Sequence, residues 1–334
     1  MKKIGLLGGG FDPIHLGHIG IALAAIEQLQ LDEVWLIVTY QPNLKHPPLG
    51  TFFHRVAMSR LAAKPYPQIK VSAIEKTLPV PSYTINTISA LKQQYLEHEF
   101  IFLIGSDQAA QLDSWHQSSR LQKMITFKVI SRGNIPGDVV LAARSFPQSS
   151  TAIRQGRLDY LDPIVYRYIL KHELYLDGIV ERQLKVKRFF HTQGVITTAL
   201  KLAKVHKIPR HQTYLAALFH DIAKGFSAKR LETYLDAQEA ATPPGVWHQY
   251  VGAKIAKDYY HIDDPEIYDA IYNHTLGNST EKLAMVIFCA DKIEPSRGYD
   301  SRQLYKLCRR DLLTGFQTVK AAHQQYNGVK DDLQ

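Results

Sequence analysis

Residues 3–18 read KIGLLGGGFDPIHLGH, and we base the predicted fold of the first half of the chain on them. Lys3–Leu7 is an apolar run typical of a buried strand, three glycines follow, and Ile19–Leu29 has apolar side chains at helical spacing. Glycine lets the backbone approach a phosphate closely, and the start of a helix presents free N–H groups to it. The stretch therefore predicts a strand, a phosphate-binding turn and a helix, in that order.

Strand and helix patterns continue to alternate as far as residue 131. The segments that carry them, in chain order and beginning with a strand, are Glu33–Val38, Arg55–Ala63, Ile69–Ala73, Thr84–Tyr95, Phe100–Ile104 and Phe127–Ser131. This alternation favours a parallel sheet covered by helices, which is a Rossmann-like α/β domain.

Beyond about Gly178 the strand patterns stop and helical patterns follow one another. They cover Arg182–His206, His211–Lys224, Ala228–Gln238, Trp247–Tyr260, Pro265–His274, Lys282–Lys292 and Asp300–Tyr326. We therefore expect an α/β domain over residues 1–180 and an all-α domain over residues 181–334. The boundary is predicted in the short polar stretch Asp177–Lys185.

The composition fits two mildly basic globular domains. The 334 residues include 40 Lys and Arg against 31 Asp and Glu, a formal net charge of +9. This excess suits anionic substrates such as nucleotides and does not require nucleic-acid binding. No apolar run approaches the ~20 residues of a membrane-spanning helix, and the first apolar stretch ends in glycine too early for a signal peptide. We expect a cytoplasmic protein with no membrane or nucleic-acid partner.

His15 and His18 are three residues apart at the predicted helix start, so both rings can face one ligand. Two imidazoles beside a glycine turn could donate hydrogen bonds to nucleotide phosphates. The segment is neither a Walker loop nor a G-x-G-x-x-G turn. Further segments follow in order: Pro81–Thr84 with Thr87, Gly105–Asp107, Trp115-His116, and Ser149–Arg154, which reads SSTAIR.

Together these segments resemble the bacterial nicotinate-nucleotide adenylyltransferases of the H-x-G-H nucleotidyltransferase superfamily, over about residues 1–178. The resemblance implies transfer of AMP from ATP to nicotinate mononucleotide, giving nicotinate adenine dinucleotide and pyrophosphate with Mg²⁺ on the phosphates. Catalysis would rest on His15, His18 and Arg154, with Ser150 and Thr151 as an N-cap pair. The implied ATP site comprises Gly9, Gly10, Phe11, His15, His18, Gly105, Asp107, Ser150, Thr151 and Arg154. The implied mononucleotide site comprises Asp12, Lys45, Tyr83, Thr84, Thr87 and Trp115.

The second half carries histidines and aspartates in a pattern that suggests a metal. They are His191, His220, Asp221, His248, His274 and Asp291. An adjacent His-Asp pair at the end of the apolar segment Leu215–Ile222 is costly to bury, and a metal ion removes that cost. Imidazoles and carboxylates suit iron, manganese or zinc better than calcium or magnesium.

The spacing of these residues resembles the HD phosphohydrolase superfamily over about residues 186–326. The segments FHTQGV (190–195), HDIAK (220–224), WH (247–248), HT (274–275) and ADKIEPSR (290–297) are similar to bacterial symmetrical diadenosine tetraphosphate hydrolases. The resemblance implies iron, or another transition metal, and cleavage to two ADP. It implies a tight metal site of His191, His220, Asp221 and Asp291, with Asp221 also catalytic. A second metal or phosphate would be held by Lys224, His248, His274 and Arg297.

Alternatives remain at the level of sequence. For the first half, pantetheine-phosphate adenylyltransferases and class I tRNA synthetases also carry H-x-G-H, but the Ser-Ser-Thr-x-x-Arg and Ser-Tyr-Thr segments argue against both. The second half is also compatible with a different nucleotide phosphohydrolase or a non-catalytic nucleotide-sensing module. The residues leave open nicotinate against nicotinamide mononucleotide, one metal ion against two, and the oligomeric state. The expected ligands are ATP, nicotinate mononucleotide and diadenosine tetraphosphate.

Overall fold

The computed structural model describes residues 1–42, 47–131, 137–139 and 149–331, with side chains described as far as residue 325 in the last helix. The chain divides into two compact units, Met1–Ile179 and Val180–Gln334. The dividing point lies inside the short helix α8 (Leu176–Glu181).

The first unit is built on a five-stranded parallel sheet with the strand order β3-β2-β1-β4-β5. The strands are β1 (Lys3–Gly9), β2 (Glu33–Val38), β3 (Ile69–Ser72), β4 (Glu99–Gly105) and β5 (Thr126–Ile130). Their sequences read as nearly continuous apolar runs because helices cover both faces of the sheet. The predicted parallel α/β architecture is confirmed.

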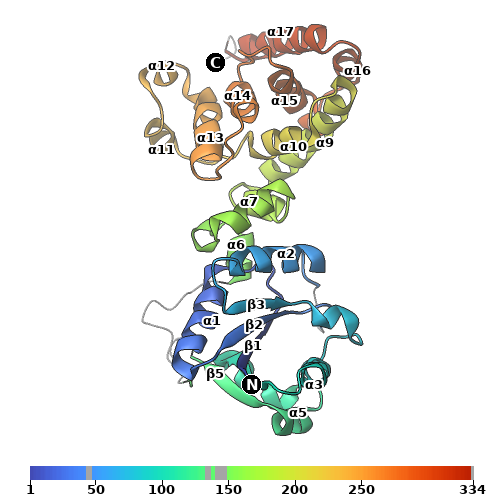
Figure 1. Cartoon of the computed structure of the whole chain (residues 1–334). Helices are drawn as coiled ribbons and strands as arrows, with labels where there is room; N and C mark the ends of the chain where they lie inside the picture. The colour runs from blue at the N-terminus through green and yellow to red at the C-terminus, as the bar shows by residue number, and fades with distance from the viewer. Residues whose placement is uncertain (43–46, 132–136, 140–148, 332–334) are drawn as a thin grey trace. The chain divides into compact units, whose positions relative to one another are not determined.

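Helices flank this sheet on its two faces (Figure 1). They are α1 (Leu16–Leu29), α2 (Phe52–Ala63), α3 (Thr84–Gln94), α4 (Ser106–Ala109) and α5 (Ser118–Met124). The unit also contains α6 (Ser150–Arg154) and α7 (Pro163–Lys171), and α7 packs against α2. Side chains of α3 and α5 pack with alternate residues of β1 and β4 in a single apolar cluster that includes Ile4, Leu6, Ile88, Phe102 and Leu121. Helices α1 and α2 contact the strands β1 to β3.

β1 lies between β2 and β4, so the chain winds outward in opposite directions from the β1–β4 pair. At such a switch point the connections leave the carboxyl ends of two neighbouring strands on opposite sides and open a crevice between them. Gly8–Gly10 at the carboxyl end of β1 and the Gly105–Asp107 segment at the carboxyl end of β4 therefore meet at one edge of the sheet.

The second unit is helical throughout its described residues, as the sequence predicts. Its helices are α9 (Val186–His206), α10 (Arg210–Phe219), α11 (Ala228–Glu232), α12 (Ala237–Ala240), α13 (Trp247–Asp258), α14 (Pro265–Asn273), α15 (Lys282–Ile293), α16 (Arg302–Arg310) and α17 (Leu312–Asp331). Every residue from Leu283 to Ile293 is buried, because α9, α10, α14 and α17 surround α15. A helix that is apolar on all sides is expected at such a central position.

Four predicted helices are wrong in extent. Arg182–His206 begins only at Val186, and His211–Lys224 ends at Phe219. The other two are each divided. Asp300–Tyr326 is divided at Asp311, whose backbone is extended, so that α17 turns back onto α16. Gly315 makes this turn possible, since a Cβ there would lie 2.6 Å from the Cα of Cys308. Ala228–Gln238 is divided as well, because the Asp236 carboxylate caps α12 by accepting from the N–H groups of Gln238 and Glu239. Among the described residues, no helix combines the length and the apolar character needed to cross a membrane.

Candidate functional sites

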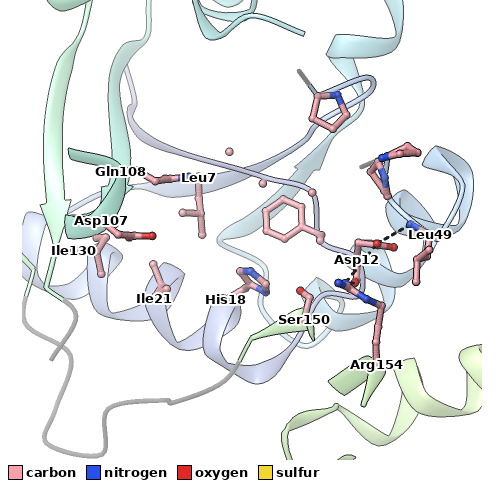
Figure 2. Close-up of a pocket in the computed structure, with 18 residues that line it drawn as sticks. Leu7, Asp12, His18, Ile21, Leu49, Asp107, Gln108, Ile130, Ser150 and Arg154 are labelled. Atoms are coloured by element: carbon pink, nitrogen blue, oxygen red, sulfur yellow. Dashed lines mark hydrogen bonds and ion pairs between the residues drawn. The ribbon is translucent and has the colours of Figure 1, made fainter. Parts of the chain in front are cut away.

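A cavity of about 530 Å³ opens at the carboxyl ends of β1 and β4, where the strand order predicts a crevice. Nine of the residues predicted to bind ATP or the mononucleotide line it: Gly9, Gly10, Phe11, Asp12, His18, Gly105, Asp107, Ser150 and Arg154. Asp107 and Gln108 lie on one side, Ser150 and Arg154 on the other, and His18 between them (Figure 2). The structure thus brings together glycine backbone, an imidazole and a guanidinium around one space.

The two histidines of the first motif are stacked at the start of α1. Their ring centroids are 3.7 Å apart, and the His15 ring is buried while His18 lines the cavity. The main-chain N–H of His15 donates to Nδ1 of His18 over 3.3 Å, so the proton of a neutral His18 ring lies on Nε2. An Nε2–H group is a hydrogen-bond donor, which suits a phosphate oxygen as its acceptor.

Arg154 is anchored by residues of the first motif. One of its nitrogens donates to the main-chain oxygen of Asp12 and lies 3.5 Å from Oδ2 of Asp12, and another donates to Thr151 over 3.2 Å. Ser150 donates to the main-chain oxygen of Pro13 over 2.9 Å. The expectation that Ser150 and Thr151 form the N-cap is wrong, because the Ser149 hydroxyl accepts from the N–H of Ala152 and α6 begins at Ser150.

Asp12 is held by more partners than the sequence suggests. Its carboxylate accepts from the N–H groups of Leu49 and Gly50, over 2.9 and 2.8 Å, and from the hydroxyl of Tyr175 over 2.7 Å. Burial raises the pKa of Tyr175, and the hydrogen bond to Asp12 raises it further, so the phenol stays protonated and remains a donor. Asp12 therefore fixes the loop around Gly50 at one wall of the cavity.

Arg55 is a residue of this site that the sequence analysis missed. Its side chain is 1% exposed and donates to the main-chain oxygens of Gly10, Thr39 and Gly50. Gly10 directly follows β1, whereas Thr39 and Gly50 lie in the connection from β2 to α2. A guanidinium buried among carbonyl oxygens ties the glycine turn to the neighbouring loops. Its position inside an ordinary amphipathic helix gives no sequence signal for this role.

The other residues predicted to bind the mononucleotide lie away from the cavity lining. Tyr83 stacks on His116 at 4.1 Å, and Trp115 packs edge-on against Phe102 at 6.1 Å. The Thr87 hydroxyl is buried and donates to Glu75 over 2.9 Å, and Thr84 begins α3. Lys45 lies outside the described residues.

In the second unit, all six predicted histidine and aspartate ligands come together and are buried. They form two groups, within each of which the ligand atoms lie within 4.8 Å of one another. The first group is His191, His220 and Asp291, and the second is Asp221, His248 and His274. Helix α9 supplies His191 and α15 supplies Asp291, whereas His220-Asp221 and His274 directly follow α10 and α14.

Asp221 stands between the two groups. Its Oδ2 lies 3.5 Å from Nε2 of His220 and 3.9 Å from Nε2 of His191. Its Oδ1 lies 3.4 Å from Nε2 of His248 and 3.6 Å from Nε2 of His274. One carboxylate therefore faces one histidine pair with each oxygen, an arrangement suited to bridging two cations.

In the neutral rings of His220 and His274, the hydrogen bonds made by Nδ1 leave the lone pair on the inward nitrogen, Nε2. Nδ1 of His220 and Nδ1 of His274 each lie 2.7 Å from a main-chain carbonyl, of Ala217 and Ile271 respectively, so both must donate there. Nε2 of His220 is buried and has no hydrogen-bond partner among the residues that the structure describes. In the neutral ring this nitrogen faces carboxylate oxygens but carries no proton that it could donate to them, which fits a metal ligand. The donor set of imidazoles and carboxylates fits a transition metal.

Glu294 orients His191, and the sequence analysis assigned it no role. Oε1 of Glu294 lies 2.8 Å from Nδ1 of His191, while Ser296 donates to the same carboxylate. Burial opposes ionisation of Glu294, but the hydrogen bonds from Ser296 and His191 outweigh it and lower its pKa. Gly194 allows this contact, since a Cβ there would lie 2.4 Å from Oε2 of Glu294. The sequence feature that could have identified Glu294 is its position three residues after Asp291.

Basic side chains surround the carboxylates of both groups. Arg297 and Lys292 contact Asp291, and Arg188 lies 2.8 Å from Oδ2 of Asp221. Lys224 lies 3.2 Å from Nδ1 of His248. Burial, followed by the charge of His274, lowers the pKa of His248 to about 2, so this ring is neutral at physiological pH. These groups line a cavity of about 320 Å³, and cations arranged in this way suit a polyphosphate.

Comparison with known proteins finds a matching family for each of the two units. The family described as cytidylyltransferase-like matches residues 6–156, and the HD domain family matches residues 188–296. A Mycoplasma pneumoniae protein named "Probable nicotinate-nucleotide adenylyltransferase/Ap4A hydrolase" is 31% identical over 332 residues, covering 93% of this chain and 96% of that protein. A Bacillus pumilus protein named "Probable nicotinate-nucleotide adenylyltransferase" is 39% identical over 187 residues, covering 52% of this chain and 99% of that protein.

Among solved structures, a Clostridium acetobutylicum protein titled "predicted HD superfamily hydrolase involved in NAD metabolism" is 27% identical, with a TM-score of 0.43. The similarity covers 47% of this chain and 86% of that protein. The match to the Mycoplasma protein extends over nearly the full length of both chains and spans both domains. The chain therefore belongs to the family of the Mycoplasma nicotinate-nucleotide adenylyltransferase/Ap4A hydrolase proteins, with a cytidylyltransferase-like domain followed by an HD domain.

Proposed function

We propose that the first unit transfers the adenylyl group of ATP to nicotinate mononucleotide. The observation that carries this proposal is the convergence of the Gly8–Gly10 turn, His18 and Arg154 on one cavity at the switch point of the sheet. The names of the relatives that match this half support the same substrates.

In this reaction a phosphate oxygen of the mononucleotide attacks the α-phosphorus of ATP, and the bond to pyrophosphate breaks. The glycine backbone can lie against the phosphate chain, the Nε2–H of His18 can donate to a phosphate oxygen, and Arg154 adds a fixed positive charge. Mg²⁺, when bound to the triphosphate, neutralises part of the charge on the leaving pyrophosphate. Positioning and charge stabilisation of this kind suffice for nucleotidyl transfer without a covalent enzyme intermediate.

The substrate is tested by incubating the protein with ATP and Mg²⁺ and with either nicotinate or nicotinamide mononucleotide. We expect dinucleotide and pyrophosphate in equal amounts, with a higher kcat/KM for the nicotinate form. A strong preference for the amide form would reject the substrate but leave the reaction class, whereas no pyrophosphate with either would reject adenylyl transfer.

We further infer that the second unit hydrolyses diadenosine tetraphosphate to two ADP. The observation that carries this proposal is the pair of ligand groups joined by Asp221, with Lys224 and Arg297 at the same cavity. His191, His220, Asp221 and Asp291 would hold the tighter metal ion, with His248 and His274 holding the second or contacting phosphate. Metal ions bound there would activate a water molecule and polarise the phosphoryl group that it attacks.

The chain's own residues then position the polyphosphate. Lys224 and Arg297 would neutralise phosphate oxygens as negative charge develops, and Glu294 would keep the His191 ring in one tautomer. Water attacks one of the two central phosphorus atoms, and the bond to the oxygen between them breaks, so that each product is ADP.

Hydrolysis in H₂¹⁸O tests this assignment. ADP should be the nucleotide product, with one ¹⁸O in the β-phosphate of half of the ADP molecules. ATP plus AMP would reject symmetrical cleavage, and cleavage of nucleoside monophosphates alone would favour the alternative of a different phosphohydrolase. A protein that binds nucleotides with its metal in place but releases no product would be a sensing module.

A further inference from the structure

A second cavity lies beside the metal-ligand groups and has a different chemical character. Its volume is about 610 Å³, within the range of about 300–1,000 Å³ typical of small-molecule sites. Three residues, Lys292, Arg297 and His323, line both this cavity and the cation-rich one described above. The two cavities therefore meet at a wall that carries two positive charges.

Beyond this wall the lining becomes apolar. Leu304 comes from α16, and Val319 and Ala322 come from α17, where Val319, Ala322 and His323 share one helix face at i, i+3 and i+4 spacing. The ring of Tyr299 completes the lining, and the residue is 50% exposed. We name this space, defined by Tyr299, Leu304, Val319, Ala322 and His323, the α16–α17 pocket.

Tyr299 is fixed in position at the pocket. Its hydroxyl donates to the main-chain oxygen of Lys292, the residue next to Asp291, so the ring is tied to the end of α15 that supplies a metal ligand. Gly298 precedes it with a positive φ of 81°, a conformation that glycine adopts without strain. The hydroxyl contact and the preceding glycine thus fix the position of the half-exposed Tyr299 ring. Such a ring is a suitable surface for another flat ring to stack on.

We propose that the α16–α17 pocket binds the nucleoside end of the nucleotide whose phosphates lie at the two metal-ligand groups. The phosphate chain would pass the wall formed by Lys292 and Arg297, and the base would stack on Tyr299 against Leu304 and Ala322. The cation-rich wall would contact the phosphates, and the apolar pocket beyond it would contact the base. The two sites therefore lie in the same order as the phosphates and the base of a nucleoside polyphosphate. The inference rests on the proposed hydrolase function and names the residues that recognise its substrate beyond the phosphates.

Ala322→Trp tests the pocket in the full-length, metal-loaded protein. Ala322 is exposed on α17, so a larger side chain can enter the pocket without displacing the buried core. Ala321→Trp is the matched control, because Ala321 is also exposed on the same helix and is absent from the lining. The KM for diadenosine tetraphosphate and the inhibition constants of ADP and inorganic tripolyphosphate are measured in the hydrolase assay.

For Ala322→Trp we expect the KM and the inhibition constant of ADP to rise at least about 10-fold, as loss of base stacking would cause. The inhibition constant of tripolyphosphate should stay within about twofold, since that anion has no nucleoside. All three values should be unchanged in Ala321→Trp. Unchanged KM and ADP inhibition in Ala322→Trp would overturn the proposal, and so would an equal loss for tripolyphosphate.

Photolabelling with 2-azido-ADP, followed by peptide mapping, separates this inference from the proposed reaction. The label is expected on the segment 299–325 in the wild type and in Ala321→Trp, and is expected to be lost in Ala322→Trp. Labelling there in a protein that leaves diadenosine tetraphosphate intact would reject the hydrolase and keep the nucleoside site. Hydrolysis without labelling of this segment, and with a wild-type KM in Ala322→Trp, would reject the site and keep the hydrolase.

Discussion

Nδ1 of His191 lies 2.8 Å from Oε1 of Glu294, a carboxylate that belongs to a residue only 1% exposed. Because an ionised carboxylate can only accept, this contact places a proton on Nδ1 of His191, and a neutral ring then keeps its lone pair on Nε2 for a metal ion. Nε2 lies 3.0 Å from Oδ1 of Asp291. Glu294 thus acts on the proposed metal site through another residue's tautomer.

Replacing Glu294 tests this positioning role. Glu294→Leu should weaken metal affinity by roughly 10–100-fold, the usual effect of removing a hydrogen-bond partner of a ligating histidine. Glu294→Gln, whose amide oxygen can still accept, should lose less. Metal titration and hydrolase rates measure both, and adenylyl transfer serves as the internal control. Equal metal affinity in Glu294→Leu and the wild type would contradict the role.

Gly194→Ala tests the close packing that brings Glu294 to His191. In an ordinary helix this substitution would stabilise by about 0.5–1 kcal/mol. Here the new Cβ would lie 2.4 Å from Oε2 of Glu294, and overpacking of this kind costs about 1–3 kcal/mol. We expect net destabilisation and weaker metal binding, measured by urea unfolding and metal titration. Lys201 is exposed on the same helix, so Lys201→Ala should change neither the stability nor the metal affinity. Increased stability of Gly194→Ala would show that Glu294 moves away without penalty.

Asp221→Ala should abolish hydrolysis of diadenosine tetraphosphate and retention of the tight metal. The reason is that each carboxylate oxygen faces a different histidine pair, so one substitution removes a ligand from both groups. His274→Ala removes a ligand from the second group alone and should cost activity with less loss of metal. Elemental analysis and product assays distinguish these outcomes. Full metal content in Asp221→Ala would remove Asp221 from the ligand set.

Removal of metal should destabilise the second unit. A metal ion at His191, His220 and Asp291 would join α9, the end of α10 and α15, so its binding energy becomes folding energy. A ligand at 100 times its Kd contributes about 2.7 kcal/mol, which corresponds to roughly 5–10 °C in Tm for a domain of this size. Calorimetry with and without a chelator measures the shift. Asp221→Ala should show no shift in Tm when the chelator is added. A wild-type Tm that the chelator does not change would argue against a resident metal.

Arg154→Ala should lower adenylyl transfer by at least ~10², as the loss of one preorganised charge contact does. Arg154 lines the cavity and is held in place by Asp12 and Thr151. The neighbouring Arg157 pairs with Asp159, is exposed and is absent from the lining, so Arg157→Ala is the matched control. Steady-state pyrophosphate release gives the rates, and circular dichroism checks folding. A near wild-type rate in Arg154→Ala would remove this residue from the catalytic set.

The order of strands and helices and the class of each domain follow from local patterns along the chain, although the ends of several helices do not. Strand and helix periods over residues 3–131 predicted the parallel sheet, and the glycines after Leu7 predicted where its cavity opens. The glycines and the adjacent His220-Asp221 pair, which we propose as part of a metal site, could be recognised in the same way. These features are local, because a period or a short motif is complete within a few consecutive residues.

Which distant residues meet depends on how the elements pack against one another. Glu294 is 103 positions from His191, and the contact depends on a glycine of α9 facing the end of α15. Arg55 reaches the glycine turn from α2, 45 positions along the chain from Gly10. The α16–α17 pocket exists because the chain reverses at Asp311 and folds α17 back onto α16. Such contacts are set by packing between elements, and the period of each element carries no information about its partner.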